Sequence, residues 1–325
     1  MPEVTMVGAL NRALRDALTE DERVLVLGED IGPLGGVFRV TDALQADFGE
    51  ERVFDTPLAE SAIAGVSLGL ALAGWRPVAE MQFDAFSYPA LDQVISHVAK
   101  YRYRSRGAAP VPLTIRIPFA GGIGAAEHHS ESPETYYAHT AGLKVVVPAS
   151  ALDAYALLRA SISDPDPVIF LEPKSRYWSK ETGDLDPGGA PIGRARLVRD
   201  GDDCTIVAYG AMVARSVQAA ERLAADRDVA CRVLDLRSLV PLDLETLARA
   251  VRETGRAVVV HEAPMTLGMG AEISARIMED CFDYLEAPVI RVTGHDTPYP
   301  PATIEQHYLP SVERIVDAVM RTVDY

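Results

Sequence analysis

The chain has 325 residues, of which 48% are hydrophobic and 24% are charged, a composition that predicts a globular protein large enough for two domains and excludes an intrinsically disordered chain. Its formal charge of −16 argues against nucleic-acid binding, because a phosphate backbone is bound by clustered Lys and Arg. The sequence has no basic segment leading into an apolar one at its start and no run of about 20 apolar residues, so neither a signal peptide nor a membrane span is predicted and a cytoplasmic protein is expected.

Short apolar runs alternate with helical patterns in the first half of the chain, which predicts a parallel sheet covered by helices. The predicted strands are VLVLG (24–28), PVAEM (77–81), PLTIRI (112–117), LKVVVP (143–148) and PVIFLE (167–172). The predicted helices lie near residues 5–20, 60–73, 87–104 and 150–162. Ser150 followed by Asp153 predicts a capped start for the last of them.

A linker is predicted at KETGDLDPGGAPIG (180–193), which is rich in Gly, Pro and Asp and lacks apolar periodicity. We therefore expect two α/β domains, at 1–186 and 187–325. The second repeats the strand pattern at CTIVAYG (204–210), VACRVLDL (229–236), AVVVHEA (257–263) and PVIRVTG (288–294). Its predicted helices lie near 211–225, 243–253, 268–281 and 311–323.

Several common site motifs are missing or weak. Gly268-Met269-Gly270 follows a strand, but Ile273 stands where a dinucleotide-binding motif has its third glycine or alanine, so a tight helix start is the better interpretation. No Walker motif and no GxSxG elbow occurs. The three cysteines form no CxxC pair and are predicted to be buried and free.

Glu60 is the only charged residue between Asp55 and Arg76, and it precedes the small, apolar run SAIAGVSLGLALAG (61–74). Burial would raise the pKa of this carboxyl, whereas a helix N-terminus would favour its anion. A carboxyl under both influences suits sharing a proton with a ring nitrogen of a bound ligand. The alternative is that Glu60 only caps the helix.

A family resemblance appears once further segments are considered. Gln82, Phe83, Phe86 and Tyr88 follow a predicted strand, at the end where parallel sheets bind ligands. The segments VFDTPLAE (53–60), EMQFDAFSYPALDQ (80–93), HHSESPETYYAHTAGLKVVVP (128–148), LEPK (171–174), HEAP (261–264) and GHDTPYP (294–300) together resemble the beta subunit of the thiamin-diphosphate-dependent 2-oxo acid dehydrogenases, in the transketolase-like superfamily. The resemblance covers nearly the whole chain and is nearest to the branched-chain type, with pyruvate and acetoin dehydrogenases next.

The resemblance implies a doubly wound, pyrimidine-binding α/β domain followed by a transketolase C-terminal-type α/β domain. It also implies that Glu60 hydrogen-bonds the aminopyrimidine ring of thiamin diphosphate and promotes formation of the reactive ylid. Leu58, Gln82 and Phe86 match the positions that line that ring. Plain core packing is the alternative for Phe83 and Tyr88.

His129 matches the family's histidine that assists acyl transfer to a lipoyl arm, with the adjacent His128 as the alternative. An imidazole suits that step, because its unperturbed pKa near ~6.5 lets it donate and accept protons at neutral pH. The sequence here is His129-Ser130-Glu131, with Glu131 where relatives often have glutamine.

The resemblance further implies a monovalent cation such as K⁺, held largely by backbone carbonyls. The matching residues are Leu113, Thr114, Ser161, Asp164 and Asp166. A plain proline-rich turn is the alternative interpretation of the SDPDP segment.

The diphosphate half of the cofactor site has no counterpart in this chain. In the family, Mg²⁺ is held by a GDG motif and a later asparagine, whereas this chain has a single asparagine, Asn11, and only Gly201-Asp202-Asp203 near GDG. We therefore expect the Mg²⁺ ligands to come from an alpha subunit in an α2β2 heterotetramer. By resemblance, the other partners are a lipoyl-bearing dihydrolipoyl acyltransferase core and a small 2-oxo acid.

The sequence disfavours two other classes of function. A non-catalytic scaffold subunit would need none of Glu60, Phe86 and His129. A self-contained transketolase-like enzyme would need a longer chain and its own metal motif.

Overall fold

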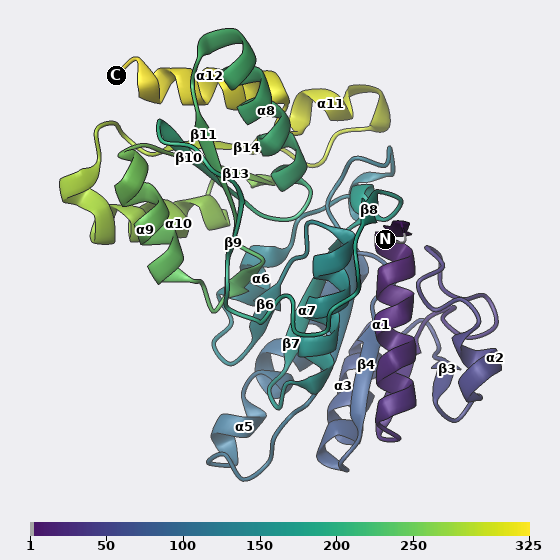
Figure 1. The fold of residues 1–325 in the computed structure, drawn as a ribbon. Coiled ribbons are helices and arrows are strands. Elements are labelled where there is room, and N and C mark those ends of the chain that lie inside the picture. The colour runs from purple at the N-terminus through teal and green to yellow at the C-terminus, as the bar shows by residue number, and fades with distance from the viewer. Residues whose placement is uncertain (1–2) are drawn as a thin grey trace. The chain divides into compact units, whose positions relative to one another are not determined.

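The computed structural model describes residues 3–325 and shows the expected two-domain α/β fold (Figure 1). The chain divides into two compact units whose positions relative to one another are not determined. The first comprises the described residues up to Phe119 together with Tyr136–Ile192, and the second comprises Ala120–Thr135 and Gly193–Tyr325. The division predicted after residue 186 lies in the segment that leads to Gly193, and it stays a prediction.

The first unit is built on a parallel sheet with the strand order β6-β7-β5-β4-β2-β3. The strands are β2 (Val24–Gly28), β3 (Val53–Asp55), β4 (Arg76–Glu80), β5 (Thr114–Phe119), β6 (Lys144–Val146) and β7 (Val168–Pro173). β2, β5 and β7 are buried along their whole length, as is typical of strands inside a parallel sheet. Because the strands are parallel, their carboxyl ends share one edge of the sheet.

Two long helices, α1 (Met6–Glu20) and α7 (Ala151–Ser163), lie side by side in this unit (Figure 1). The side chains of Thr5 and Ser150 cap them, each accepting a hydrogen bond from the backbone three residues on. Both helices contribute to one core cluster, and Tyr155 Oη donates to Asp16 Oδ2 at 2.8 Å between them. The predicted cap at Ser150 is confirmed.

The helix predicted near residues 87–104 is interrupted. It forms a 3₁₀ segment (Ala85–Ala90), α4 (Leu91–Gln93), a π segment (Val94–Val98) and α5 (Tyr101–Arg104). Pro89 lies inside the 3₁₀ segment and has no N–H to donate, which disfavours a continuous α-helix there. The remaining helices of this part of the chain are α2 (Leu44–Phe48), α3 (Glu60–Leu72) and α6 (Glu134–Ala138), with a 3₁₀ turn at Lys174–Arg176.

The start of the predicted linker is a strand. β8 (Lys180–Thr182) pairs antiparallel with β1 (Glu3–Thr5), with Glu3 opposite Thr182. Neither strand shows an apolar alternation, so the sequence pattern did not reveal the pair.

The second unit has a five-stranded sheet with the order β14-β13-β10-β11-β9. β9 (Arg196–Arg199) is antiparallel to its neighbour, and the sequence did not predict it. The other strands of this sheet are β10 (Cys204–Ala208), β11 (Cys231–Asp235), β13 (Ala257–Pro264) and β14 (Ile290–Gly294). β12 (Ser238–Val240) is not part of this sheet. The helices are α8 (Met212–Arg227), α9 (Leu244–Thr254), α10 (Met269–Cys281), α11 (Glu305–Tyr308) and α12 (Val312–Val323), and 3₁₀ turns lie at Glu127–His129, Phe282–Tyr284 and Ala302–Ile304. The three cysteines are free and buried, as expected.

No helix among residues 3–325 is both long enough and apolar enough to span a membrane.

A buried ion network joins three neighbouring strands of the first unit. Arg116 on β5 is fully buried and binds Glu172 on β7 through two parallel hydrogen bonds of 2.7 and 2.8 Å. It also pairs with Glu80 at the end of β4. Burial alone would lower the pKa of Arg116, but the two carboxylates raise it above its ordinary value. Tyr177 Oη donates to Glu172 Oε2 at 2.6 Å and completes the network.

Replacing this guanidinium tests how much the network contributes. Arg116→Met keeps an apolar side chain of similar length but leaves Glu80 and Glu172 buried without their cation. We expect the free energy of unfolding to fall by about 3–5 kcal/mol in denaturant titrations. Arg23→Met, which removes an exposed ion pair with Asp21, is the control and should cost far less. Equal losses in the two variants would contradict the interpretation.

Candidate active site

Glu60 is the first residue of α3, and only 8% of its surface is exposed. The N-cap is Ala59, which makes no side-chain capping hydrogen bond, and Glu60 lies in the first turn. The choice between a helix-capping and a ligand-binding role for Glu60 stays a prediction. α3 begins shortly after β3, so the carboxyl of Glu60 belongs to the edge of the sheet where the parallel strands end.

Glu29 directly follows β2 at the same edge and is the feature of the site that sequence reasoning missed. Its side chain is 5% exposed, and Oε1 accepts no hydrogen bond from residues 3–325. Burial, together with the charges of Glu60 and Asp30, raises the pKa of Glu29 to about 7. The site therefore combines Glu60 with a second carboxyl that titrates near neutral pH, a property concentrated at functional sites.

Gln82 joins the segments that follow β4 and β2, because its Nε2 donates to Asp30 Oδ2 at 2.9 Å. Phe86 is half-buried, and its ring meets that of Phe83 edge-on with the centroids 5.9 Å apart. Phe83 is itself buried, which agrees with the packing role weighed for it. The structure thus brings Gln82 and Phe86 to the same sheet edge as Glu60.

Leu58 has a different environment. Its side chain is 71% exposed, so residues 3–325 cover little of it. An exposed leucine next to a buried acid offers an apolar contact to a ligand ring or to another chain.

A second buried ion pair holds the segment that carries Gln82 and Phe86. Lys174 Nζ lies 3.4 Å from Asp84 Oδ1, and both side chains are fully buried. The same ammonium lies 6.0 Å from the centroid of the Phe83 ring. These contacts restrict the segment, which a preorganised ligand site requires.

His129 belongs to the second unit, in the 3₁₀ turn Glu127–His129. It is half-buried, whereas His128 is exposed, and the two rings meet edge-on with centroids 4.2 Å apart. His129 Nδ1 lies 2.9 Å from the carbonyl oxygen of His128. The choice between them stays a prediction in favour of His129.

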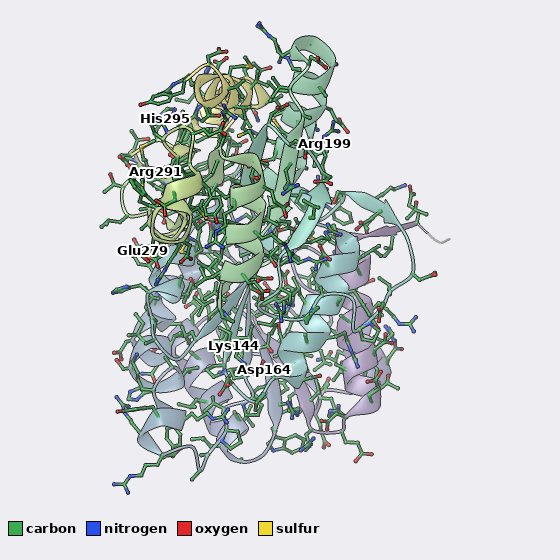
Figure 2. The ribbon with its side chains drawn as sticks, turned by 60° about the vertical axis from the view of Figure 1, so that its left-hand side comes forward. Lys144, Asp164, Arg199, Glu279, Arg291 and His295 are labelled. Atoms are coloured by element: carbon green, nitrogen blue, oxygen red, sulfur yellow. The ribbon has the colours of Figure 1, made fainter. Side chains whose placement is uncertain are left out.

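The predicted cation-binding residues surround a turn whose carboxylates already have partners. Both carboxylate oxygens of Asp164 accept hydrogen bonds of 2.7 Å from Lys144 Nζ (Figure 2). Asp166 pairs with Arg102. No cluster of three or more His, Cys, Asp or Glu that could hold a metal is found among residues 3–325.

The backbone carbonyls of the same turn are also engaged. The Leu113 carbonyl accepts from the Val168 N–H at 2.9 Å, and the Ser161 carbonyl accepts from the Asp164 N–H at 3.2 Å. A carbonyl oxygen has a second lone pair. The second lone pairs of the Leu113 and Ser161 carbonyls could still bind a monovalent cation, and the assignment of Leu113, Thr114 and Ser161 to such a site stays a prediction.

The raised pKa of Glu29 has a measurable consequence for stability. The folded protein holds this proton up to about pH 7, whereas the unfolded chain releases it near its ordinary value of 4.5, so stability falls as pH rises between these values. Glu29→Gln mimics the protonated acid. We expect its melting temperature to match the wild type below about pH 4.5, to exceed it progressively up to pH 7, and to keep that advantage above pH 7. A difference that is independent of pH would contradict the raised pKa, and the exposed Glu22→Gln variant controls for the loss of one charge.

Comparison with known proteins shows similarity to two domain families and to named relatives. Residues 2–179 match the transketolase pyrimidine-binding domain, and residues 193–315 match the transketolase C-terminal domain. The chain is 56% identical to 3-methyl-2-oxobutanoate dehydrogenase subunit beta of Mycobacterium tuberculosis, over 98% of this chain and 92% of that one. It is 51% identical to pyruvate dehydrogenase E1 component subunit beta of Leifsonia xyli, over 98% and 95% of the two chains.

A third relative, 2-oxoisovalerate dehydrogenase subunit beta of Pseudomonas aeruginosa, is 44% identical over 99% of this chain and 95% of its own. Among solved structures, a split-gene transketolase described as an inactive beta4 tetramer has a TM-score of 0.81 at 25% identity, covering 99% of this chain and 98% of that one. The matches span both units. The chain therefore belongs to the family of beta subunits of the thiamin-diphosphate-dependent 2-oxo acid dehydrogenases.

Proposed function

We propose that this chain is the catalytic beta subunit of a decarboxylating component that acts oxidatively on a branched-chain 2-oxo acid and passes the acyl group to the lipoyl arm of a dihydrolipoyl acyltransferase. The observation that carries the proposal is the buried carboxyl of Glu60, placed at the start of α3 beside Glu29. A pyruvate dehydrogenase beta subunit is the second candidate, because a relative with that name is 51% identical. Acetoin remains a third substrate to assay.

The residues at the sheet edge fit the aminopyrimidine half of thiamin diphosphate. Glu29 Oε1 is buried without a hydrogen bond from residues 3–325, and Leu58 presents an exposed apolar side chain. Leu58 and Phe86 would bound the flat ring, while Gln82, oriented by Asp30, would bond to its polar edge. When bound, thiamin diphosphate supplies the electron sink for decarboxylation.

Glu60 acts on a proton. Its carboxyl would share a proton with a ring nitrogen of the aminopyrimidine, and the apolar residues of α3 would keep water from competing for that hydrogen bond. Glu29, with its pKa of about 7, limits the negative charge near Glu60 when it is protonated.

His129 works at a later step, as general acid or base in acyl transfer to the lipoyl group. A half-buried imidazole on a short turn is accessible to a second protein and still restricted in direction. This role distinguishes a catalytic subunit from a scaffold, which needs neither His129 nor Glu60.

The remaining parts of the active enzyme come from partners. An alpha subunit, in an α2β2 heterotetramer, supplies the Mg²⁺ ligands for the diphosphate. The sequence basis is the lack of a GDG motif followed by an asparagine. A K⁺ ion on the carbonyl oxygens of Leu113, Thr114 and Ser161 would be structural. The predicted 1–186 and 187–325 division and the cytoplasmic location belong to the same proposal.

Glu60→Gln tests the catalytic assignment. The amide keeps the size of the side chain but cannot share a proton with the ring nitrogen. We expect decarboxylation of 3-methyl-2-oxobutanoate by the reconstituted α2β2 complex, followed with an artificial electron acceptor, to fall by about 10² or more. Gel filtration should show unchanged assembly, and Glu22→Gln should keep full activity. A fully active Glu60→Gln complex would exclude the proposed role, and the same assay with pyruvate and acetoin ranks the substrates.

Calorimetric titration tests the division of the cofactor site. Thiamin diphosphate with Mg²⁺ is titrated into this chain alone and into its mixture with the alpha subunit. We expect heat of binding only in the mixture, because this chain lacks the metal motif. Tight binding to the chain alone would contradict the inferred partner.

A further inference from the structure

The segment that carries His129 is a closed loop. The N–H of Ala120 donates to the carbonyl oxygen of Glu131 at 2.8 Å, which joins the two ends of residues 120–131. In the sequence, this segment lies between elements of the first unit, yet it groups with the second. Something in the second unit must therefore hold it.

Glu305 is one of the groups that hold the loop. Its side chain is 4% exposed, although residues 301–304, 306 and 307 around it are exposed. Its Oε1 accepts hydrogen bonds from the N–H of Gly122 at 2.9 Å and from the N–H of Gly124 at 3.3 Å. The Tyr299 hydroxyl donates to the same oxygen at 2.7 Å.

Glu262 provides a second attachment point. Its Oε2 accepts a hydrogen bond of 3.0 Å from the N–H of Gly121. Glu262 lies on β13, and Glu305 is the first residue of α11. Two elements that are separate in the sequence therefore bind the same short glycine segment.

These hydrogen bonds require glycine in the loop. Gly122 and Gly124 have φ angles of +88° and +69°, a left-handed conformation in which backbone N–H groups turn toward one anion. A Cβ at Gly121 would lie 1.7 Å from the Tyr299 hydroxyl, so only glycine fits there. Gly122 and Gly124 thus form an anion-binding nest whose anion is the carboxylate of Glu305. Burial and the charge of Glu305 raise the pKa of Tyr299, so this hydroxyl stays a donor.

We propose that Glu305 is a positioning residue for His129: by holding the glycine nest, it fixes the loop that presents this imidazole for acyl transfer. The inference rests on the proposed function of His129. The path is short, because the carbonyl of Ala126 accepts from the His129 N–H at 2.9 Å and the turn with His129 begins at Glu127, three residues after Gly124. His129 therefore lies between the attachment at Gly124 and the closure at Glu131.

The test is a double-mutant cycle in the reconstituted complex with a lipoyl domain as acceptor. Glu305→Ala should lower the rate of lipoyl acylation about tenfold, since a hydrogen-bonded buried charge is lost. Decarboxylation with an artificial electron acceptor should change less than about twofold, because that assay bypasses the lipoyl group. Glu305→Gln keeps the accepting oxygen and should recover part of the loss. Glu313→Ala, which removes an exposed carboxylate paired with Arg222, is the control.

The decisive comparison uses His129→Ala, which should itself lower acylation more than decarboxylation. In that background, Glu305→Ala should cause no further loss of acylation, because its effect acts through His129. An equal loss in both backgrounds would overturn the proposal. If Glu305→Ala does not fold, Tyr299→Phe removes one donor from the same oxygen, and a smaller loss with the same dependence on His129 is expected.

Amide hydrogen exchange separates this proposal from the proposed function. In the full chain, the amides of Gly122 and Gly124 should exchange about tenfold faster in Glu305→Ala than in the wild type. Unchanged exchange would show that Glu305 does not hold the loop. If the wild-type complex acylates no lipoyl domain, the proposed function fails, and the exchange rates still decide whether the anchor exists.

Discussion

The position of the residues at the candidate site depends on a guanidinium buried inside a sheet. Arg116 binds Glu172 on one neighbouring strand and Glu80 on the other, so three adjacent strands are tied together close to their carboxyl ends. Gln82 follows Glu80 by two residues, and the segment after it is held by Lys174, which follows Glu172 by two. A buried ion pair adds little net stability by itself, because desolvation offsets the attraction. Here the ion network fixes the relative positions of the strand ends at the edge of the sheet where the candidate site lies.

The same edge gathers two further buried carboxyls, those of Glu29 and Glu60. Glu29 and Glu60 lie within electrostatic reach, and the cost of burying both as anions appears as the raised pKa of Glu29. The fold therefore treats its buried acids in two ways. Glu80 and Glu172 on the strands are hydrogen-bonded to Arg116. Glu29, beyond the end of β2, has a pKa raised to about 7, which lets it exchange a proton near neutral pH, as acid–base chemistry requires.

Periodicity predicted the elements that are determined locally. The strand at Val24–Gly28 and the start of α7 after Ser150 follow from an apolar run and a capping residue. The helix predicted near 87–104 is not continuous, and a 3₁₀ segment replaces its start around Pro89. The sequence did not predict β8, because its partner β1 is over 170 residues away in the sequence. Among site residues, Glu60 stood out as a lone charge in an apolar stretch. Glu29 did not, because Glu-Asp after a strand is common at surfaces, although a buried run ending in two acids was a usable signal.

Glu305 was beyond the reach of sequence reasoning for a more general reason. A glycine cluster indicates that backbone N–H groups converge on an anion, but it does not say which anion. Phosphates of a ligand are the familiar case. Here the anion is the side chain of Glu305, 183 residues after Gly122, and its identity depends on the tertiary fold. An internal carboxylate has one advantage over a ligand phosphate, since it is always present. In the role proposed for His129, the loop presents the imidazole before any substrate arrives, and an anchor that is always present suits that role.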